Sequence, residues 1–311
     1  MNERELLEAA GRLPKSIEPP RDLWPGIEAR LGRGKRRWYW VPLAAAAALV
    51  AVLIARQGGG WSVTWLAGTG PGTLRVGQWV ETDDSSRALI AVGSIGQVEV
   101  RPDTRIRLVV ARADNHRLAL AYGAIEAKVD TIPRLFFVET PVGTAIDLGC
   151  AYTLEMDSLG NGLLHVTAGE VEFQGTGGEA RVPMGALVVT RAAVGPGIPY
   201  VEDASDALRR ALAALPAIDV RAVLAAARPD DAISLWHLLR RVDASQRGAV
   251  YDRLAALVPP PPDVTRAGAL ALEMPSLEAY WSHIQRILFR KMILQGVRDI
   301  DPRTGRGTPA R

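Results

Sequence analysis

The chain has 311 residues, a net charge of +3 at neutral pH and one cysteine, Cys150. A single cysteine excludes an intrachain disulfide and a structural zinc site built on cysteines. Much of the basic excess lies in a short cluster before an apolar segment, where membrane topology and attraction to anionic lipid explain it. We therefore expect no direct binding to nucleic acid.

Residues 1–37 form a short arm that the sequence predicts to be helical. A charged amphipathic stretch stops before Pro14, and Asp22 can cap a second helix that ends at Gly32 or Gly34. An amphipathic arm can place its apolar side chains in a groove of a partner protein, and the alternative is a remnant that only anchors the chain. The side chains expected to do so are Leu6, Leu7, Leu13, Leu23, Trp24, Ile27 and Leu31.

Residues 38–55 (WYWVPLAAAAALVAVLIA) are the one long uncharged apolar run. As a helix this run is roughly 27 Å long, enough to cross the hydrocarbon core of a bilayer. By the positive-inside rule, the basic residues before it keep the arm in the cytoplasm and export the rest of the chain. A buried alanine-rich helix and a cleaved signal peptide are the alternatives. The residues that set the topology are Arg33, Lys35, Arg36 and Arg37.

Residues 56–73 are rich in glycine and predict a flexible linker. Within residues 74–200, short segments alternate apolar and polar residues and are bounded by Gly, Pro, Asp or Asn. This period of two predicts about ten short antiparallel strands. Since no helical pattern separates them, they favour an all-β domain in the form of a sandwich, a jelly roll or a wound β-stack.

Residues 203–298 change to a helical pattern. Four amphipathic helices with short connectors are expected first, and a final helix runs from residue 275 to about residue 296. The tail, residues 299–311, is expected to be disordered. The predicted fold class is therefore multi-domain, with a single transmembrane helix, an all-β domain and a C-terminal α-helical domain.

Three segments of the β region carry a family resemblance. Residues 136–148 read FFVETPVGTAIDL, residues 166–171 read VTAGEV and residues 183–187 read PMGAL. Their order and spacing resemble the signature of FecR-type periplasmic domains, over about residues 75–195. The resemblance implies a FecR-like β domain in the periplasm. The signature residues are Phe137, Thr140, Pro141, Gly143, Thr144 and Gly169.

The arm carries a second resemblance. Residues 19–31 (PPRDLWPGIEARL) resemble the juxtamembrane end of the cytoplasmic domain in membrane-anchored anti-sigma factors, although the His-x-x-x-Cys-x-x-Cys zinc motif of such domains is missing. In that family the cytoplasmic domain holds an RNA polymerase sigma factor, and the exported part receives a signal from a partner. The resemblance implies a regulator of the bacterial inner membrane with a cytoplasmic N-terminus and most of the chain in the periplasm. Its partners would be a sigma factor, an unknown periplasmic or outer-membrane protein, and the lipid bilayer.

The sequence contains no recognised catalytic or metal-binding pattern. The four histidines do not stand at the spacing of metal ligands, and no nucleophile elbow is present. We therefore expect no enzymatic activity, no metal and no cofactor, and the alternative function is an envelope scaffold or binding module with no transcriptional role. Individual side chains are expected in solvent (His165, Arg209, Arg210, Arg240, Arg241), in a buried position (Cys150), in a packing or surface position (His237) and in the core (Trp236, Tyr280, Trp281).

Overall fold

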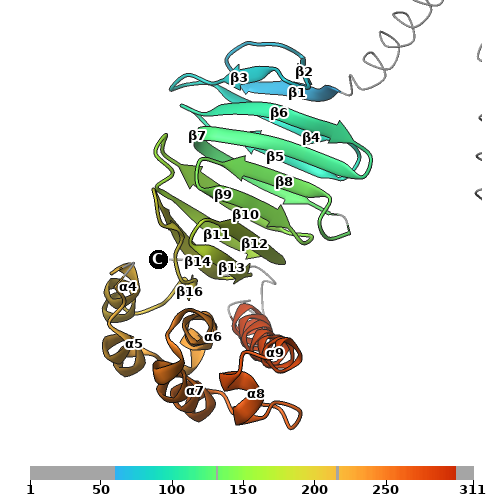
Figure 1. Cartoon of the computed structure of the whole chain (residues 1–311). Helices are drawn as coiled ribbons and strands as arrows, with labels where there is room; N and C mark the ends of the chain where they lie inside the picture. The colour runs from blue at the N-terminus through green and yellow to red at the C-terminus, as the bar shows by residue number, and fades with distance from the viewer. Residues whose placement is uncertain (1–59, 131, 215–216, 299–311) are drawn as a thin grey trace, which may run out of the picture. The chain divides into compact units, whose positions relative to one another are not determined.

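The computed structural model describes residues 60–298 except 131 and 215–216, with the side chains of the last helix described as far as Lys291. Within this part, all strands belong to one hydrogen-bonded sheet, and helices follow it (Figure 1). The strands are β1 (Gly60–Ala67), β2 (Thr73–Arg75), β3 (Trp79–Glu81), β4 (Arg87–Val92), β5 (Gly96–Val100), β6 (Arg105–Arg112), β7 (Asn115–Val129), β8 (Phe136–Thr140), β9 (Gly143–Asp147), β10 (Ala151–Met156), β11 (Gly162–Ala168), β12 (Glu170–Gly175), β13 (Gly178–Pro183), β14 (Ala186–Arg191), β15 (Gly195–Pro196) and β16 (Tyr200–Val201).

The long strand β7 joins two arms of the sheet. Its first half pairs with β6 and β8, and its second half pairs with β5 and β10. The halves meet at Gly123, whose φ is +97° and where a Cβ atom would collide with the backbone of Thr104. Glycine accepts both constraints, so the strand continues through the junction. The β13 arm has the order β3-β6-β7-β8-β9-β12-β13, and the β14 arm has the order β1-β4-β5-β7-β10-β11-β14.

The two arms face each other across an apolar core. Along β7, Leu118, Leu120, Ile125 and Ala127 are all buried while their neighbours are more exposed, as the period of two requires. The ring of Trp61 on β1 lies 6.4 Å from the ring of Phe136 on β8, so side chains of opposite arms meet in the core. Burial of each such side chain contributes about 1.5–3 kcal/mol to stability.

The predicted fold class is wrong on two points. The sixteen strands of the described residues form one continuous sheet through β7, because Gly123 extends a strand where the sequence suggested a boundary. One strand pair, β7 with β8, is parallel. Among the residues that the structure describes, no helix is long and apolar enough to cross a membrane. The predicted spanning segment 38–55, the arm 1–37 and the tail 299–311 lie outside those residues.

The predicted linker is also corrected in part. Strand β1 lies inside residues 56–73 and pairs with β4, and its Trp61 and Val63 are buried. Trp61, Val63 and Trp65 alternate with polar or smaller residues, which is the normal signal of a half-buried strand. The strand was not predicted because the glycines on either side indicated a flexible linker.

The helices begin after β16. Side-chain caps fix two of their starts: Ser205 accepts a hydrogen bond from the Leu208 N–H and Asp219 accepts one from the Ala222 N–H, each at 3.2 Å. Trp236, Tyr280 and Trp281 are buried, which confirms their expected place in the core. The two shortest helices, η1 and α8, were not predicted, because they are too short to show a period. The helices are α4 (Asp206–Ala213), α5 (Val220–Ala226), η1 (Pro229–Asp231), α6 (Ala232–Arg241), α7 (Ala244–Leu257), α8 (Arg266–Leu270) and α9 (Met274–Arg298).

Candidate functional site

The three segments of the family resemblance meet in the structure. The Leu148 N–H donates to the Glu170 carbonyl at 3.2 Å, and the Met184 N–H donates to the Gly169 carbonyl at 2.8 Å. A third bond of 2.8 Å joins the Gly185 N–H to the Val166 carbonyl. Segments that lie far apart in the sequence therefore form one continuous surface.

Most of the signature residues lie in the hairpin of β8 and β9. The Thr140 hydroxyl donates to the Gly143 carbonyl at 2.8 Å across the turn that holds Pro141. Phe137 is half-buried beneath the guanidinium group of Arg117, 4.3 Å from the ring centre. Thr144 pairs with Gln174 of β12, which joins the hairpin to the rest of the β13 arm.

Gly169 lies apart from the hairpin, in the turn between β11 and β12. Its φ is +71°, and a Cβ atom at this position would collide with the carbonyl oxygen of Gly149. Only glycine allows this contact. The turn can therefore lie directly against the segment that connects β9 to β10.

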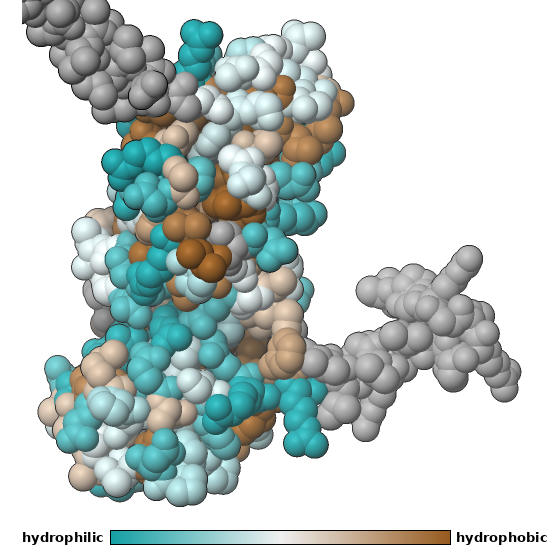
Figure 2. Space-filling view, turned by 90° about the vertical axis from the view of Figure 1, so that its right-hand side faces the viewer, coloured by the Kyte–Doolittle hydropathy of each residue, from teal (hydrophilic) through white to brown (hydrophobic). Residues whose placement is uncertain are grey.

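A groove of about 640 Å³ separates this surface from α9, and we call it the α9 groove. The sheet side is built entirely from the three signature segments. On the helix side, Phe289 is 53% exposed, and Figure 2 shows hydrophobic surface on the helical part as well as on the sheet part. The groove is lined by Leu148, Ala168, Gly169, Glu170, Pro183 and Met184 of the sheet and by Ser282, Gln285, Arg286, Leu288 and Phe289 of α9.

Ionic contacts hold α9 beside the sheet. Arg181 of β13 donates from Nε to Glu170 at 2.6 Å and from Nη1 to Glu278 of α9 at 2.7 Å. Gln285 of α9 donates to the other oxygen of Glu170 at 2.6 Å. Burial alone would lower the pKa of Arg181, but its contacts with Glu170 and Glu278 more than offset this and raise the pKa. These contacts join α9 to β12 and β13 at this end of the groove.

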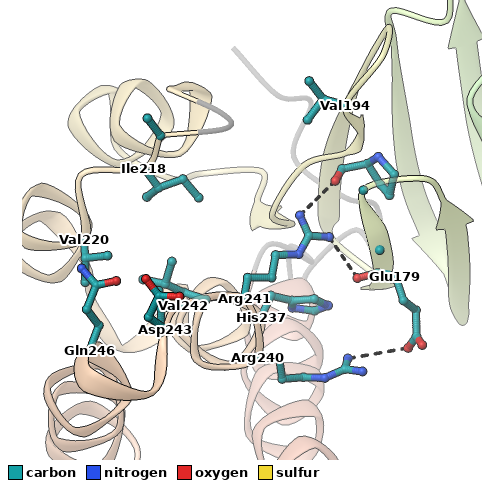
Figure 3. A pocket seen from close by; sticks show the side chains of 15 residues that line it. Glu179, Val194, Ile218, Val220, His237, Arg240, Arg241, Val242, Asp243 and Gln246 are labelled. Atoms are coloured by element: carbon teal, nitrogen blue, oxygen red, sulfur yellow. Dashed lines mark hydrogen bonds and ion pairs between the residues drawn. The ribbon is translucent and has the colours of Figure 1, made fainter.

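A second cavity of about 690 Å³, the α6 pocket, lies where the end of α6 meets the turns before β13 and β15 (Figure 3). His237 of α6 accepts a hydrogen bond on Nε2 from the Arg181 N–H at 2.9 Å, and its Nδ1 lies 2.8 Å from the Ile233 carbonyl. This pairing requires the neutral ring with its proton on Nδ1. Burial, together with nearby arginines, lowers the pKa of His237 to about 3.

Arg241 lies one helical turn after His237 and also reaches the sheet. It donates from Nη1 to the Pro196 carbonyl at 2.9 Å and from Nη2 to the Glu179 carbonyl at 3.0 Å. Burial and the adjacent Arg240 lower its pKa to about 10. Because β13 is the last strand of its arm, His237 and Arg241 together cover polar groups of a free strand edge.

The structure shows the surroundings of three residues whose exposure was predicted, Arg241, His165 and Cys150. The expected solvent exposure of Arg241 is wrong, because the residue faces the edge of β13. His165 alternates outward between the buried Leu164 and Val166, as expected, with 24% of its side chain exposed and Glu202 at 3.7 Å. Cys150 is buried as expected, and burial raises the pKa of its thiol. Residues 60–298, where described, contain no group of three His, Cys, Asp or Glu that could hold a metal.

Two sets of predicted site residues lie outside the described part of the chain. These are the apolar side chains of the arm and the basic residues before the predicted span, all within residues 1–37. The α9 groove and the α6 pocket were not predicted, because both depend on contacts between the sheet and the helices.

Comparison with protein families and comparison with curated proteins both give no match. Among solved structures, the chain is similar to two crystal structures of a proposed anti-sigma factor from Parabacteroides distasonis ATCC 8503, each at 15% identity and a TM-score of 0.36. The match covers 40% of this chain and 60% of that chain. Similarity at this level does not establish the family, so the assignment to the FecR type stays a prediction.

Proposed function

We propose that the chain is a FecR-like regulatory protein that works through protein–protein contacts, and that its folded part binds a protein partner in the α9 groove. One observation carries this proposal: all six sheet residues that line the groove come from the three signature segments. The exposed ring of Phe289 stands opposite them on α9. An apolar groove with an exposed aromatic side chain is typical of protein-binding surfaces. The expected occupant is an apolar segment of a periplasmic or outer-membrane protein.

A sigma factor of RNA polymerase is the partner that we propose for residues 1–37. The support is the resemblance of residues 19–31 to the juxtamembrane end of membrane-anchored anti-sigma factors. In this proposal the arm restrains the sigma factor, and a partner in the α9 groove supplies the signal. No enzymatic activity is required for either step.

The location that we propose is the bacterial inner membrane, with the folded part in the periplasm. The support is the asymmetry of charge in the sequence, where Arg33, Lys35, Arg36 and Arg37 precede the apolar run. Cell fractionation and a periplasm-active reporter fused to the C-terminus test this location. A reporter active in the cytosol would contradict it.

The regulatory role is tested with the full-length chain. We expect it to capture a sigma subunit from cells, and Trp24→Asp to abolish capture because a charge replaces an apolar contact of the arm. Equal capture by Trp24→Asp and the unaltered chain would contradict the proposed arm contact. If the full chain captures no sigma subunit, the transcriptional role is wrong.

The α9 groove needs a separate test. A photo-crosslinking residue at position 289 should capture an envelope protein, and Met184→Asp on the opposite wall should abolish that crosslink. The matched control places the crosslinker at Leu159, which is also apolar and 68% exposed but lies between β10 and β11. The same products from both positions would contradict a specific partner site in the groove.

A further inference from the structure

The α6 pocket contains a cation whose hydrogen-bonding capacity is only partly used. A guanidinium group has five N–H donors. Within the described chain, Arg241 donates to two carbonyl groups and forms no ion pair with a carboxylate. Both acceptors are neutral, so the positive charge of this largely buried group is not balanced by its contacts.

The neighbouring charges compensate Arg241 only in part. Burial and the positive charge of Arg240 lower the pKa of Arg241 by more than Glu179 raises it, and the Glu179 carboxylate lies 3.6 Å from Arg240 Nη1. The guanidinium of Arg240 also stacks on the ring of Trp236 at 4.7 Å, which holds it beside the pocket. A negatively charged group entering the pocket would therefore meet the guanidinium group of Arg241, which has no hydrogen bond to a carboxylate among the described residues, while Arg240 points toward Glu179 (Figure 3).

The rest of the pocket has the size and the surface for a small organic molecule. Its volume of about 690 Å³ lies in the range of ligand sites. Val194, Ile218 and Val220 supply apolar surface, and Figure 3 shows Ile218 and Val220 across an open space from Arg241. Asp243 and Gln246 lie on that same far side. They offer acceptors for a donor group on the ligand.

We infer that the α6 pocket binds a small aliphatic carboxylate, with the carboxylate on Arg241 and the hydrocarbon portion against Ile218 and Val220. The planar carboxylate matches the fork of N–H groups on a guanidinium. An amino group on the ligand would be placed toward Asp243 or Gln246. This site does not depend on the proposed regulatory function, because binding is measured on the purified chain alone.

Three probes of similar shape separate the contributions. Isothermal titration with 4-methylpentanoate, L-leucine and isoamylamine compares a carboxylate, a zwitterion and an amine. We expect the first two to bind and isoamylamine to fail, with leucine tighter if the far wall contacts its amino group. Equal binding of isoamylamine, or no binding of either carboxylate, would overturn the inference.

Variants then identify the residues. Arg241→Gln should weaken 4-methylpentanoate by about tenfold or more, and Arg240→Gln should weaken it by a smaller factor of about three. Glu179→Gln should tighten binding by about threefold, because it removes a negative charge that acts on both Arg241 and Arg240. Arg112→Gln, on an exposed arginine of β6, is the matched control and should change nothing.

Glu179→Gln is expected to tighten ligand binding, and a tighter complex cannot result from loss of folding. Loss of binding in Arg241→Gln is meaningful only if the variant unfolds at the same temperature as the unaltered chain, since Arg241 also holds the edge of β13. If Arg241→Gln does not fold, Glu179→Gln decides the matter. Unchanged or weaker binding in that variant would contradict the inference, as would full affinity in a folded Arg241→Gln.

Discussion

His237 in the helices and Asp147 in the sheet are both 1% exposed, yet their polar atoms differ in hydrogen bonding. Both ring nitrogens of His237 have partners, at 2.9 Å and 2.8 Å. Asp147 accepts a hydrogen bond from the Gly149 N–H at 2.6 Å through Oδ1, but its Oδ2 has no partner among the described residues. The helices thus meet the sheet through a fully paired neutral group, whereas the sheet contains an acid that is only partly paired.

The two groups give opposite dependences of stability on pH. The pKa of His237 is lowered from 6.5 to about 3, so the unfolded state binds the extra proton and stability falls as pH falls through this range. The pKa of Asp147 is raised by burial from 3.8 to about 6. In that case the folded state binds the extra proton, and stability falls as pH rises toward and through 6. His237 therefore reduces stability as pH falls from 6.5 toward 3, whereas Asp147 reduces it as pH rises from 3.8 to about 6.

The largest expected effect is at His237. Between pH 6.5 and 3, protonation of this histidine in the unfolded state should remove on the order of 4 kcal/mol of stability, at about 1.4 kcal/mol per pH unit. His237→Gln keeps an acceptor for the Arg181 N–H but cannot titrate, so it should lose most of this acid sensitivity. Urea unfolding at pH 7, 5 and 4 measures the change.

His283→Gln is the matched control for this prediction. It removes an imidazole from α9 and leaves the edge of β13 untouched. We expect its acid sensitivity to equal that of the unaltered chain. If His237→Gln and the unaltered chain lose stability in parallel as pH falls, the pairing of His237 with β13 does not control acid unfolding.

A smaller effect of opposite sign is expected at Asp147. Asp147→Asn keeps the oxygen that accepts from Gly149 and removes the buried charge, so it should raise stability at pH 8 by roughly 2–3 kcal/mol. Little gain is expected at pH 4, where the acid is protonated in the folded state. Thermal unfolding at both values measures this, with Asp84→Asn on the exposed turn after β3 as the control. A gain of equal size at both pH values would contradict a role for the charge.

Sequence patterns correctly predicted the strands and helix starts that depend only on residues close together in the chain. The alternation around Val98 and Ile125 marks segments that are strands β5 and β7, and the caps at Ser205 and Asp219 mark the starts of α4 and α5. The course of β7 was missed, because Gly123 resembles a strand boundary when its surroundings are unknown. Only the close approach of Thr104 shows why a glycine belongs inside this strand.

The candidate site could be predicted only on its sheet side. The signature segments were recognised, but the wall that α9 supplies depends on contacts such as that of Glu170 with Gln285, 115 positions apart. Arg241 was expected in solvent, because a pair of arginines near a helix end normally lies there. Its acceptors are 45 and 62 positions away, and no period in the sequence reports such a contact.

The smallest effects on stability are expected at two buried hydroxyl groups, one in the helices and one in the sheet. Ser234 of α6 is fully buried and donates to the Pro199 carbonyl at 2.7 Å, whereas the hydroxyl of the buried Tyr152 has no partner among the described residues. Ser234→Ala should cost about 1 kcal/mol at any pH, because it leaves a buried carbonyl unpaired. Tyr152→Phe removes an unpaired polar atom and should be neutral or stabilising by up to about 1 kcal/mol. Urea unfolding of both variants measures the difference, and a larger loss in Tyr152→Phe would mean that the hydroxyl in the sheet is paired after all.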